Sequence, residues 1–211
     1  GVKAVFNSAF SFHPGYLEKI QAYAHGQYPP GSECIILAAI GAREVVVGFT
    51  VAFYFADLKM AYLDYIASDP KKSSRGIGGA LYEAMRNDLK KRGARRLFFD
   101  SLPDVPGPNV DPSLVADSKK RMAFYERLGA RPIIGTQYEY IVTPAHLGYP
   151  NCLMQDGLVQ TTPVTRYRLE SVIARIMLAK CNRGPQDEPL KSLLASVKDN
   201  PVQIRTPRYP S

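Results

Sequence analysis

The segment SDPKKSSRGIGGALYEAM at residues 68–85 combines a cluster of cations with three glycines, just before apolar residues of helical spacing. Inside a helix, glycine costs about 1 kcal/mol more than alanine, so glycines at the point where a helix begins need another explanation. The first amide groups of a helix have no partner within it and carry a partial positive charge, so they bind phosphate when a ligand can approach closely. We therefore expect the backbone of residues 74–79 to form a phosphate-binding cradle.

The charge around this segment favours an anionic ligand. Between residues 71 and 96, only Glu83 and Asp88 oppose a series of cations. The cations are Lys71, Lys72, Arg75, Arg86, Lys90, Lys91, Arg92, Arg95 and Arg96. Such a surface attracts anions. The alternative is that the glycines only let the helix pack closely against a strand.

Two common nucleotide-binding motifs do not fit this segment. A Walker A loop requires a lysine followed by Ser or Thr after the glycines, and the sequence has none there. A Rossmann site places its glycines after the first strand of a parallel unit, whereas these glycines follow the third strand of a series that we predict to be antiparallel.

The spacing of apolar residues predicts the elements that position this segment. The expected strands cover residues 2–7, two runs within 33–55 joined around 41–43, then 60–68, 94–102 and 136–144. The expected helices cover residues 13–28, 77–92, 118–130, 166–182 and 188–200, and an extended tail covers 202–211. This order predicts an α/β (α+β) fold with a mixed, mostly antiparallel sheet flanked by helices, and a helical C-terminal extension. We expect one domain at residues 1–148 and the extension with its tail at 149–211.

Two motifs carry a resemblance to a known family. DPKKSSRGIGGAL, at residues 69–81, resembles the DPx₂[QR]xxGxGxAL acetyl-CoA loop of the GNAT N-acetyltransferase superfamily, and AFYERLGA, at residues 123–130, resembles its AxxFYEKLGF segment. The resemblance covers residues 1 to about 145 and implies the GNAT sheet, with acetyl-CoA as co-substrate and no metal. It also implies that the loop amides hold the pyrophosphate of coenzyme A and that the preceding strand pairs with the pantetheine.

The resemblance assigns a set of residues to acetyl-CoA. They are Ile66, Ala67, Ser68, Ser73, Ser74, Arg75, Gly76, Ile77, Gly78, Gly79, Ser118 and Tyr125. The sequence departs from the family at Ser73, where Gln or Arg is usual, and at Ser118, where an Asn often contacts coenzyme A. The resemblance also implies that Tyr125 faces the departing sulfur and could give it a proton; the alternative is a tyrosine that only buries its ring.

Acyl transfer to an amine needs a base, because an amine with a pKa of about 10.4 is protonated at neutral pH. Since side chains alternate along a strand, we expect Tyr62, Asp64 and Ile66 to share one face of the strand at residues 60–68. Similar enzymes often carry the base there, which makes Asp64 the predicted base and Tyr62 a substrate-binding residue of the acceptor pocket. The alternatives for the base are a water chain and, for Asp64, a structural pair with a nearby Lys or Arg. A backbone N–H near Ile66 would polarise the acyl carbonyl.

The acceptor is harder to predict. Acids at or after the strand 94–102 would suit a cationic amine, and Asp100 is the predicted substrate-binding residue, although solvated loop acids are the default explanation. The others in this group are Asp104, Asp111 and Asp117. We expect a small-molecule or protein amine as partner.

Three functions are compatible with the fold class and motifs of this sequence. The leading one is an acetyl-CoA-dependent N-acetyltransferase that acts on a primary amine by direct attack in a ternary complex. The alternative is a catalytically weak acyl-CoA-binding regulatory or sensing domain, possibly part of a longer polypeptide. Nucleic-acid binding by the basic helix 77–92 is disfavoured, because that helix has no interleaved aromatic residues and no recognisable DNA-binding motif.

Composition adds three expectations. The apolar runs are too short to cross a bilayer, so no membrane association is expected, and the three separated cysteines fit a reducing cytoplasm and no zinc site. In the extension, an apolar stripe must be covered by the sheet, a second copy in a homodimer, or a further domain. The stripe consists of Leu169, Val172, Ile173, Ile176 and Met177.

Overall fold

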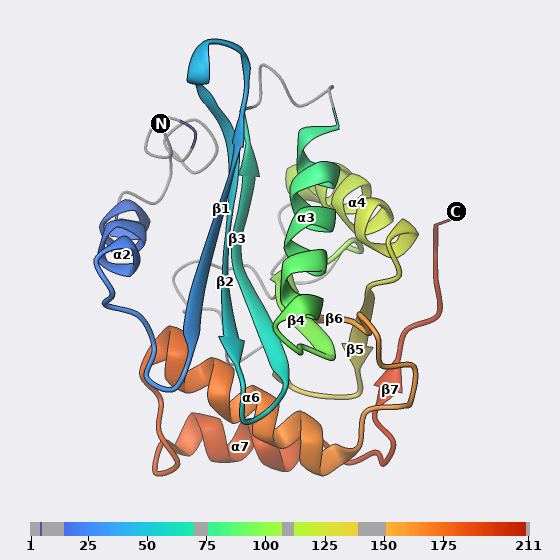
Figure 1. Ribbon diagram of the computed structural model, residues 1–211. Coiled ribbons are helices and arrows are strands. Elements are labelled where there is room, and N and C mark those ends of the chain that lie inside the picture. Colours follow the sequence, from blue (N-terminus) through green and yellow to red (C-terminus); the bar gives the residue numbers. More distant parts are fainter. Residues whose placement is uncertain (1–4, 6–14, 70–75, 107–111, 139–150, 210–211) are drawn as a thin grey trace. The chain divides into compact units, whose positions relative to one another are not determined.

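A computed structural model of the chain describes residue 5 and residues 15–69, 76–106, 112–138 and 151–209 (Figure 1). The chain divides into two compact units, Gly1–Leu97 and Phe98–Ser211. Each unit contains strands and helices, and most of the strand pairs are antiparallel, so the mixed α/β fold expected from the sequence is confirmed. The predicted boundary at residue 148 stays a prediction.

The first unit is built on three antiparallel strands in the order β1-β2-β3. Strand β1 covers Glu33–Ile40, β2 covers Val46–Phe55 and β3 covers Met60–Ser68, and the short 3-10 helix η1, Ala42–Glu44, joins the first two. Their long runs of β-branched and aromatic residues suit a strand buried on both faces, and β2 is buried at nearly every position. The strands predicted within 33–55 and at 60–68 are therefore confirmed.

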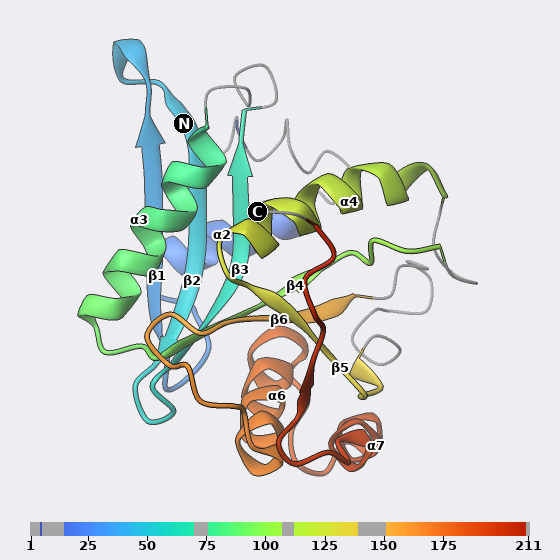
Figure 2. The same ribbon diagram turned by 90° about the vertical axis from the view of Figure 1, so that its right-hand side faces the viewer.

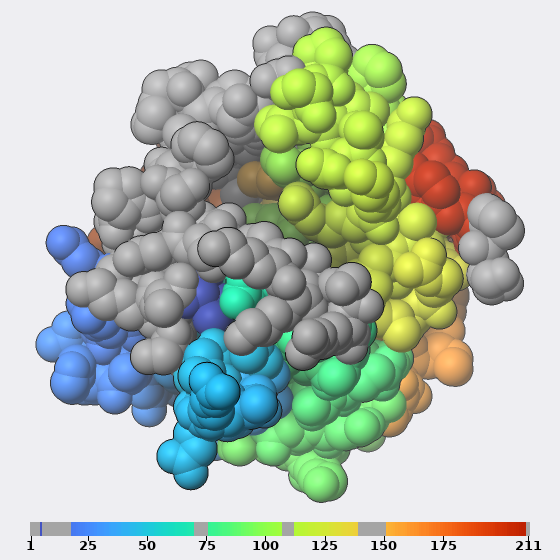
Figure 3. Space-filling view, turned by 90° about the horizontal axis from the view of Figure 1, so that it is seen from above, coloured from blue at the N-terminus to red at the C-terminus, as the bar shows by residue number. Residues whose placement is uncertain are grey.

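Two helices cover the strands of the first unit. Helix α2, Gly15–Ala24, and helix α3, Ile77–Lys91, lie on opposite faces of the three strands (Figures 1 and 2). Helix α3 ends as expected, with Lys90 and Lys91 in its last turn and Gly93 at a φ of 93°. The turn between β1 and β2 and the start of α3 lie at the same end of this unit, the end viewed in Figure 3.

The second unit contains the strands in the order β4-β6-β5-β7. Strand β4, Arg96–Ser101, begins in the last residues of the first unit, and β5, Arg131–Ile134, pairs antiparallel with β6, Cys152–Asp156, and with β7, Gln203–Ile204. The helices of this unit are α4, Pro112–Arg127, α6, Arg166–Cys181, and α7, Glu188–Ser196. The apolar stripe of α6 is fully buried within this chain, from Leu169 to Met177.

The structure differs from the sequence-based expectation in three elements. Helix α4 begins at Pro112 and not at residue 118, because a proline is readily accommodated in the first turn, where its missing N–H has no partner to lose. Of the strand predicted at 136–144, residues 136–138 are not a strand and the rest lies outside the described residues; the chain forms β5 earlier and β6 later. Of the strand predicted at 2–7, only residue 5 is described, and it is helical.

Candidate functional site

Among the described residues, none covers or caps the start of helix α3. Gly76 occupies the N-cap position in the left-handed region, at a φ of 71°, and no side chain caps the helix there. Ala80 N–H makes the first intrahelical bond, to Gly76 O at 3.0 Å, so the amides of Ile77, Gly78 and Gly79 have no partner within the helix. Within the described residues, no atom lies within 4 Å of a Cβ built on Gly76 or Gly78. The predicted contacts Ser73, Ser74 and Arg75 lie outside the described residues.

A different glycine makes the close contact between helix and strand. A Cβ built on Gly48 of β2 would lie 2.7 Å from Leu81 Cδ1 and 3.0 Å from Ile77 Cγ2, both on α3, and 3.0 Å from Ala67 O on β3. Close packing of α3 therefore depends on Gly48. Because Gly76 and Gly78 have open space around them in the described part of the chain, packing against that part does not explain why they are glycines.

Strand β3 contains an irregularity at Asp64. On its partner β2, Val51 pairs with Tyr65 and the next residue, Ala52, pairs with Leu63, so Asp64 is the extra residue at a shift in the register. An extra residue of this kind bends a strand and redirects its side chains, and such irregularities are frequent beside active sites.

This irregularity corrects the predicted face of β3. Tyr62 pairs with Phe53, whose ring lies 5.0 Å from that of Tyr23 on α2, so Tyr62 points to the α2 face. Ile66 pairs with Thr50, which alternates with Phe53 along β2 and therefore points to the opposite face. The prediction that Tyr62, Asp64 and Ile66 share one face is wrong for Ile66, because the extra residue shifts the alternation.

Asp64 lies against helix α2. Tyr23 donates its hydroxyl hydrogen to Asp64 Oδ2 over 3.3 Å, and Lys19 Nζ lies 3.9 Å from the same oxygen. The Asp64 side chain is only 4% exposed. Across the strands, burial and then the negative charge of Asp64 raise the pKa of the Cys34 thiol to about 11. Cys34 is therefore a protonated thiol at neutral pH and a poor nucleophile.

The residues after Asp64 continue the antiparallel ladder. Ile66, Ala67 and Ser68 pair with Thr50, Phe49 and Gly48 of β2. Ile66 and Ser68 are half-buried and Ala67 is buried. The ladder thus runs to the last residue of β3, which lies at the same end of the unit as the start of α3.

The second unit carries Ser118 and Tyr125. Both are buried on α4, seven residues apart and hence on one face, together with Val115 and Met122. The Tyr125 ring centroid lies 4.5 Å from that of Phe99 on β4. Burial raises the pKa of Tyr125 to about 12, and the nearby charge of Arg121 opposes this only partly. Its phenol therefore keeps its proton at all physiological pH values.

Asp100 already has two partners in the second unit. Tyr138 donates its hydroxyl hydrogen to Asp100 Oδ1 over 2.7 Å, and Lys180 Nζ contacts Oδ2. The Asp100 side chain is 11% exposed. These contacts occupy both oxygens, so an acceptor amine would have to compete with Lys180. The predicted role of Asp100 in acceptor binding stays a prediction.

Sequence reasoning did not identify Lys19 and Tyr23 as neighbours of Asp64, nor Lys180 as a neighbour of Asp100. Each lies 41 or more positions from its acid, as Tyr23 does from Asp64, and no spacing rule links residues so far apart. The described residues contain no group of three or more His, Cys, Asp or Glu that could hold a metal ion. None of the described helices is long and apolar enough to cross a membrane.

Comparisons with known proteins agree with the resemblance carried by the motif at residues 69–81. The model of the acetyltransferase (GNAT) family matches residues 2–107. No curated protein matches the sequence. Among solved structures, the ribosomal-protein-S18-alanine N-acetyltransferase from Escherichia coli is 22% identical, with a TM-score of 0.53 over 75% of this chain and 86% of that chain.

Two further solved structures have similar scores. An aminoglycoside 6'-N-acetyltransferase complexed with coenzyme A is 16% identical, with a TM-score of 0.53 over 74% of this chain and 88% of that chain. The aminoglycoside 6'-N-acetyltransferase from Enterococcus faecium is 16% identical, with a TM-score of 0.51 over the same shares, 74% and 88%. At these identities the likeness establishes the fold.

Proposed function

We propose that this chain, which belongs to the acetyltransferase (GNAT) family, transfers an acetyl group from acetyl-CoA to a primary amine. The amine attacks the thioester directly while both substrates are bound. The titles of two structural neighbours name an alanine of a ribosomal protein and the 6' nitrogen of an aminoglycoside, which supports an amine acceptor of the small-molecule or protein kind.

The open start of α3 is the observation that carries this proposal. The amides of Ile77, Gly78 and Gly79, which have no partner within the helix, and the positive end of the helix dipole favour the diphosphate of coenzyme A. The first turn of α3 has no acidic residue that would repel it. Because Gly76 and Gly78 face open space within the described residues, a ligand can approach the backbone itself.

The proposed reaction moves protons at both ends. The ammonium group of the acceptor loses one proton to Asp64, directly or through water. The neutral nitrogen then forms a bond to the acetyl carbon and gives its second proton to the solvent. The carbon–sulfur bond then breaks and the thiolate of coenzyme A leaves. Asp64 lies at the irregularity of β3, and because such irregularities are frequent beside active sites, this position supports the proposed role.

Tyr125 is the proposed partner of the departing sulfur. Its pKa of about 12 keeps the phenol in its donor form. An ordinary thiol has a pKa of about 8.5, so complete transfer of the phenol proton to the thiolate is unfavourable by about three pKa units. We infer that Tyr125 stabilises the thiolate mainly by donating a hydrogen bond, with the solvent completing protonation.

One observation favours the second candidate, an acyl-CoA-binding domain without turnover. Asp64 accepts a hydrogen bond from Tyr23 and lies 3.9 Å from Lys19 Nζ, as expected for an acid with a structural role. A carboxylate paired with an ammonium group is a weaker base. In this case coenzyme A would bind at α3 and no acetyl group would leave it.

Two measurements on the full chain separate these functions. Calorimetric titration with coenzyme A tests the site at α3, and isotope-labelled acetyl-CoA with a panel of small amines, aminoglycosides and peptides tests the transfer. Binding with transfer of label to an amine supports the acetyltransferase. Binding without transfer to any acceptor would establish the second candidate, and the lack of binding would defeat both.

A further inference from the structure

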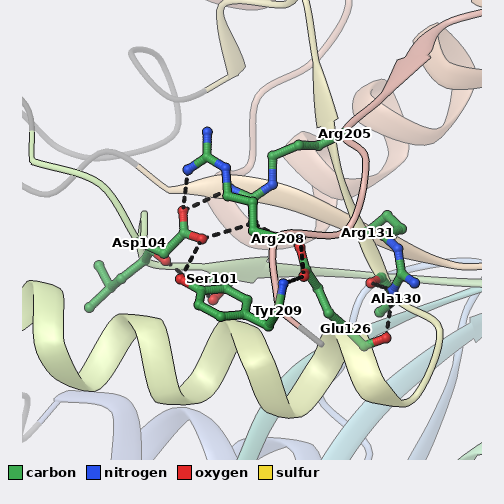
Figure 4. A network of polar contacts seen from close by, with 9 residues as sticks. Ser101, Asp104, Glu126, Ala130, Arg131, Arg205, Arg208 and Tyr209 are labelled. Atoms are coloured by element: carbon green, nitrogen blue, oxygen red, sulfur yellow. Dashed lines mark hydrogen bonds and ion pairs between the residues drawn. The ribbon is translucent and has the colours of Figure 1, made fainter. Parts of the chain in front are cut away.

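The C-terminal segment of the chain closes on two buried carboxylates of the second unit. This segment, Arg205–Tyr209, is here called the C-terminal strap, and it contacts Asp104 and Glu126 (Figure 4). Asp104 follows strand β4 and Glu126 lies near the end of helix α4. Both side chains are only 1% exposed.

Arg205 joins the two acids. Its guanidinium donates to both oxygens of Asp104, over 2.7 and 2.8 Å, and to Glu126 Oε1 over 2.9 Å. The Arg205 side chain is 11% exposed, so the whole arrangement is shielded from water. Two buried carboxylates repel each other unless a cation lies between them, and the planar guanidinium suits this position.

The rest of the strap adds contacts to the same acids. Glu126 Oε2 accepts from the amides of Arg208 and Tyr209, over 2.8 and 3.1 Å. Asp104 Oδ2 accepts from the Tyr209 hydroxyl over 3.0 Å. At its other end the strap is anchored by Arg205 N–H, which donates to Pro132 O of β5 over 2.9 Å. The strap thus binds both acids with side-chain and backbone donors.

The position of Glu126 gives these contacts a functional meaning. Glu126 directly follows Tyr125, and Asp104 follows the strand that carries Phe99, against which the Tyr125 ring packs. Contacts that join Asp104 to Glu126 therefore fix the C-terminal end of α4 relative to the end of β4. Tyr125 lies at this end of α4, so a shift of this end of the helix would move its side chain.

We propose that Arg205 is a positioning residue for acetyl transfer, acting through Asp104 and Glu126 to hold Tyr125 in place. This inference rests on the proposed function. The family model matches residues 2–107, and the strap lies outside this range. The proposed positioning effect therefore comes from a part of the chain that the family match does not cover. Ser118 lies two helical turns from the strap contact at Glu126, so the strap governs the Tyr125 end of α4 more than the Ser118 end.

Three variants separate positioning from ordinary stability. Arg205→Met removes the cation between the two acids. Arg205→Lys keeps the charge but cannot donate to both acids in the same planar fork. Arg166→Met is the matched control, since Arg166 belongs to α6 of the same unit and its ion pair with Glu170, at 3.7 Å, is exposed.

Amide hydrogen exchange on the full chain gives a readout that needs no turnover. In Arg205→Met, we expect exchange in α4, residues 112–127, to rise about tenfold or more and exchange in α6 to change less than about twofold. Arg166→Met should leave α4 unchanged. An equal rise in α4 and α6 would show that Arg205 only stabilises the unit, and would overturn the proposal.

Kinetics with the amine found in the acceptor panel test the consequence for catalysis. We expect Arg205→Met to lower kcat about tenfold or more, with KM for acetyl-CoA within about threefold, and Arg205→Lys to restore part of kcat. Unchanged kcat in a variant whose α4 exchanges faster would overturn the positioning role. A wild-type chain that transfers no acetyl group would defeat the proposed function instead, and the exchange data would then decide whether the strap holds α4.

Discussion

Gly48 of β2 faces Leu81 of α3 so closely that a Cβ on the glycine would lie 2.7 Å from the leucine Cδ1. Gly78, two residues into α3, has open space around it within the described residues. The two glycines thus have different roles, one in packing and one at the proposed phosphate site.

This contrast predicts opposite effects of two alanine substitutions. Gly78→Ala should raise the free energy of unfolding by up to about 1 kcal/mol, because alanine favours a helix, and should weaken coenzyme A binding about tenfold by obstructing the amides. Gly48→Ala should lower the free energy of unfolding by about 1–3 kcal/mol through overpacking. Urea denaturation and calorimetric titration measure the two quantities. Tight coenzyme A binding by Gly78→Ala would contradict the proposed site.

A second prediction concerns the base. If Asp64 takes the proton of the amine, Asp64→Asn should lower kcat/KM about 100-fold or more and weaken its dependence on pH in the acidic range. Tyr23→Phe removes one hydrogen bond to Asp64 and should lower kcat/KM by less than about tenfold. Steady-state rates at several pH values measure both. Equal rates for Asp64→Asn and the wild type would favour a water chain or a domain without turnover.

The thiol of Cys34 offers a test of the surroundings of Asp64. Burial, and then the charge of Asp64, raise the pKa of Cys34 from 9.0 to about 11. A raised pKa contributes stability below the unfolded value, and this contribution is lost as the pH rises towards about 11. Iodoacetamide at pH 8, followed by mass spectrometry, should therefore modify the exposed Cys181 and leave Cys34 unmodified.

The same reagent tests the link between the two residues. Asp64→Asn removes the negative charge of Asp64, which is the smaller of the two causes of the raised Cys34 pKa. The variant should therefore increase the rate of Cys34 alkylation at pH 9–10, where the thiolate fraction limits the reaction. Lys120→Met, on an exposed pair in α4, is the control and should leave the rate unchanged. Cys34 that reacts as fast as Cys181 at pH 8 would contradict the buried environment.

The ion pair between Lys180 and Asp100 leads to a prediction about acceptor binding. If Asp100 binds the ammonium group of the acceptor, Lys180 competes with it for Oδ2. Lys180→Met should then lower KM for the amine about threefold or more, and Asp100→Asn should raise it. Lys191→Met, which breaks a more exposed pair with Glu188, serves as the control. If neither Lys180→Met nor Asp100→Asn changed KM for the amine, Asp100 would not be part of the acceptor site.

The C-terminal strap predicts a dependence of stability on acid. Burial alone would raise the pKa of Asp104 and of Glu126, but hydrogen bonds from the strap, led by those of Arg205, hold both values below the usual range. A lowered pKa contributes stability above the unfolded values of about 4, and this contribution is lost as the pH falls through the folded values. Urea denaturation should therefore show a decrease in stability below about pH 4. Arg205→Met should show a smaller decrease, and an equal slope for both chains would refute the linkage.

Strands β1, β2 and β3 and helix α3 of the first unit were predictable because each is encoded locally. Strand β3 was predicted with the bounds Met60–Ser68 that the structure shows, since its β-branched and aromatic residues favour a buried strand. The face of each side chain was not predictable, because the extra residue at Asp64 shifts the alternation, and this shift depends on the pairing with β2. Local composition contains no signal for such a register.

The second unit was predicted less well because its strands are short. Strand β6, Cys152–Asp156, has five residues and β7, Gln203–Ile204, has two, so neither has a run long enough to display a period. The partners of Asp104 are 101 to 105 positions away in the C-terminal strap. The sequence alone indicated that an acid follows a strand. That Arg205 neutralises this acid could be seen only in the folded structure.

Because of the register shift in β3, the proposed active site depends on the number of residues in this strand as well as on their types. Deleting a single residue between Tyr62 and Tyr65 would restore an even ladder with β2. Tyr65 and the residues after it would keep their partners on β2, but the residue left between Tyr62 and Tyr65 would pair with Ala52, so the placement of Asp64 beside Tyr23 and Lys19 would be lost. Natural variants of this strand should therefore tolerate changes of residue type more readily than changes in the number of residues.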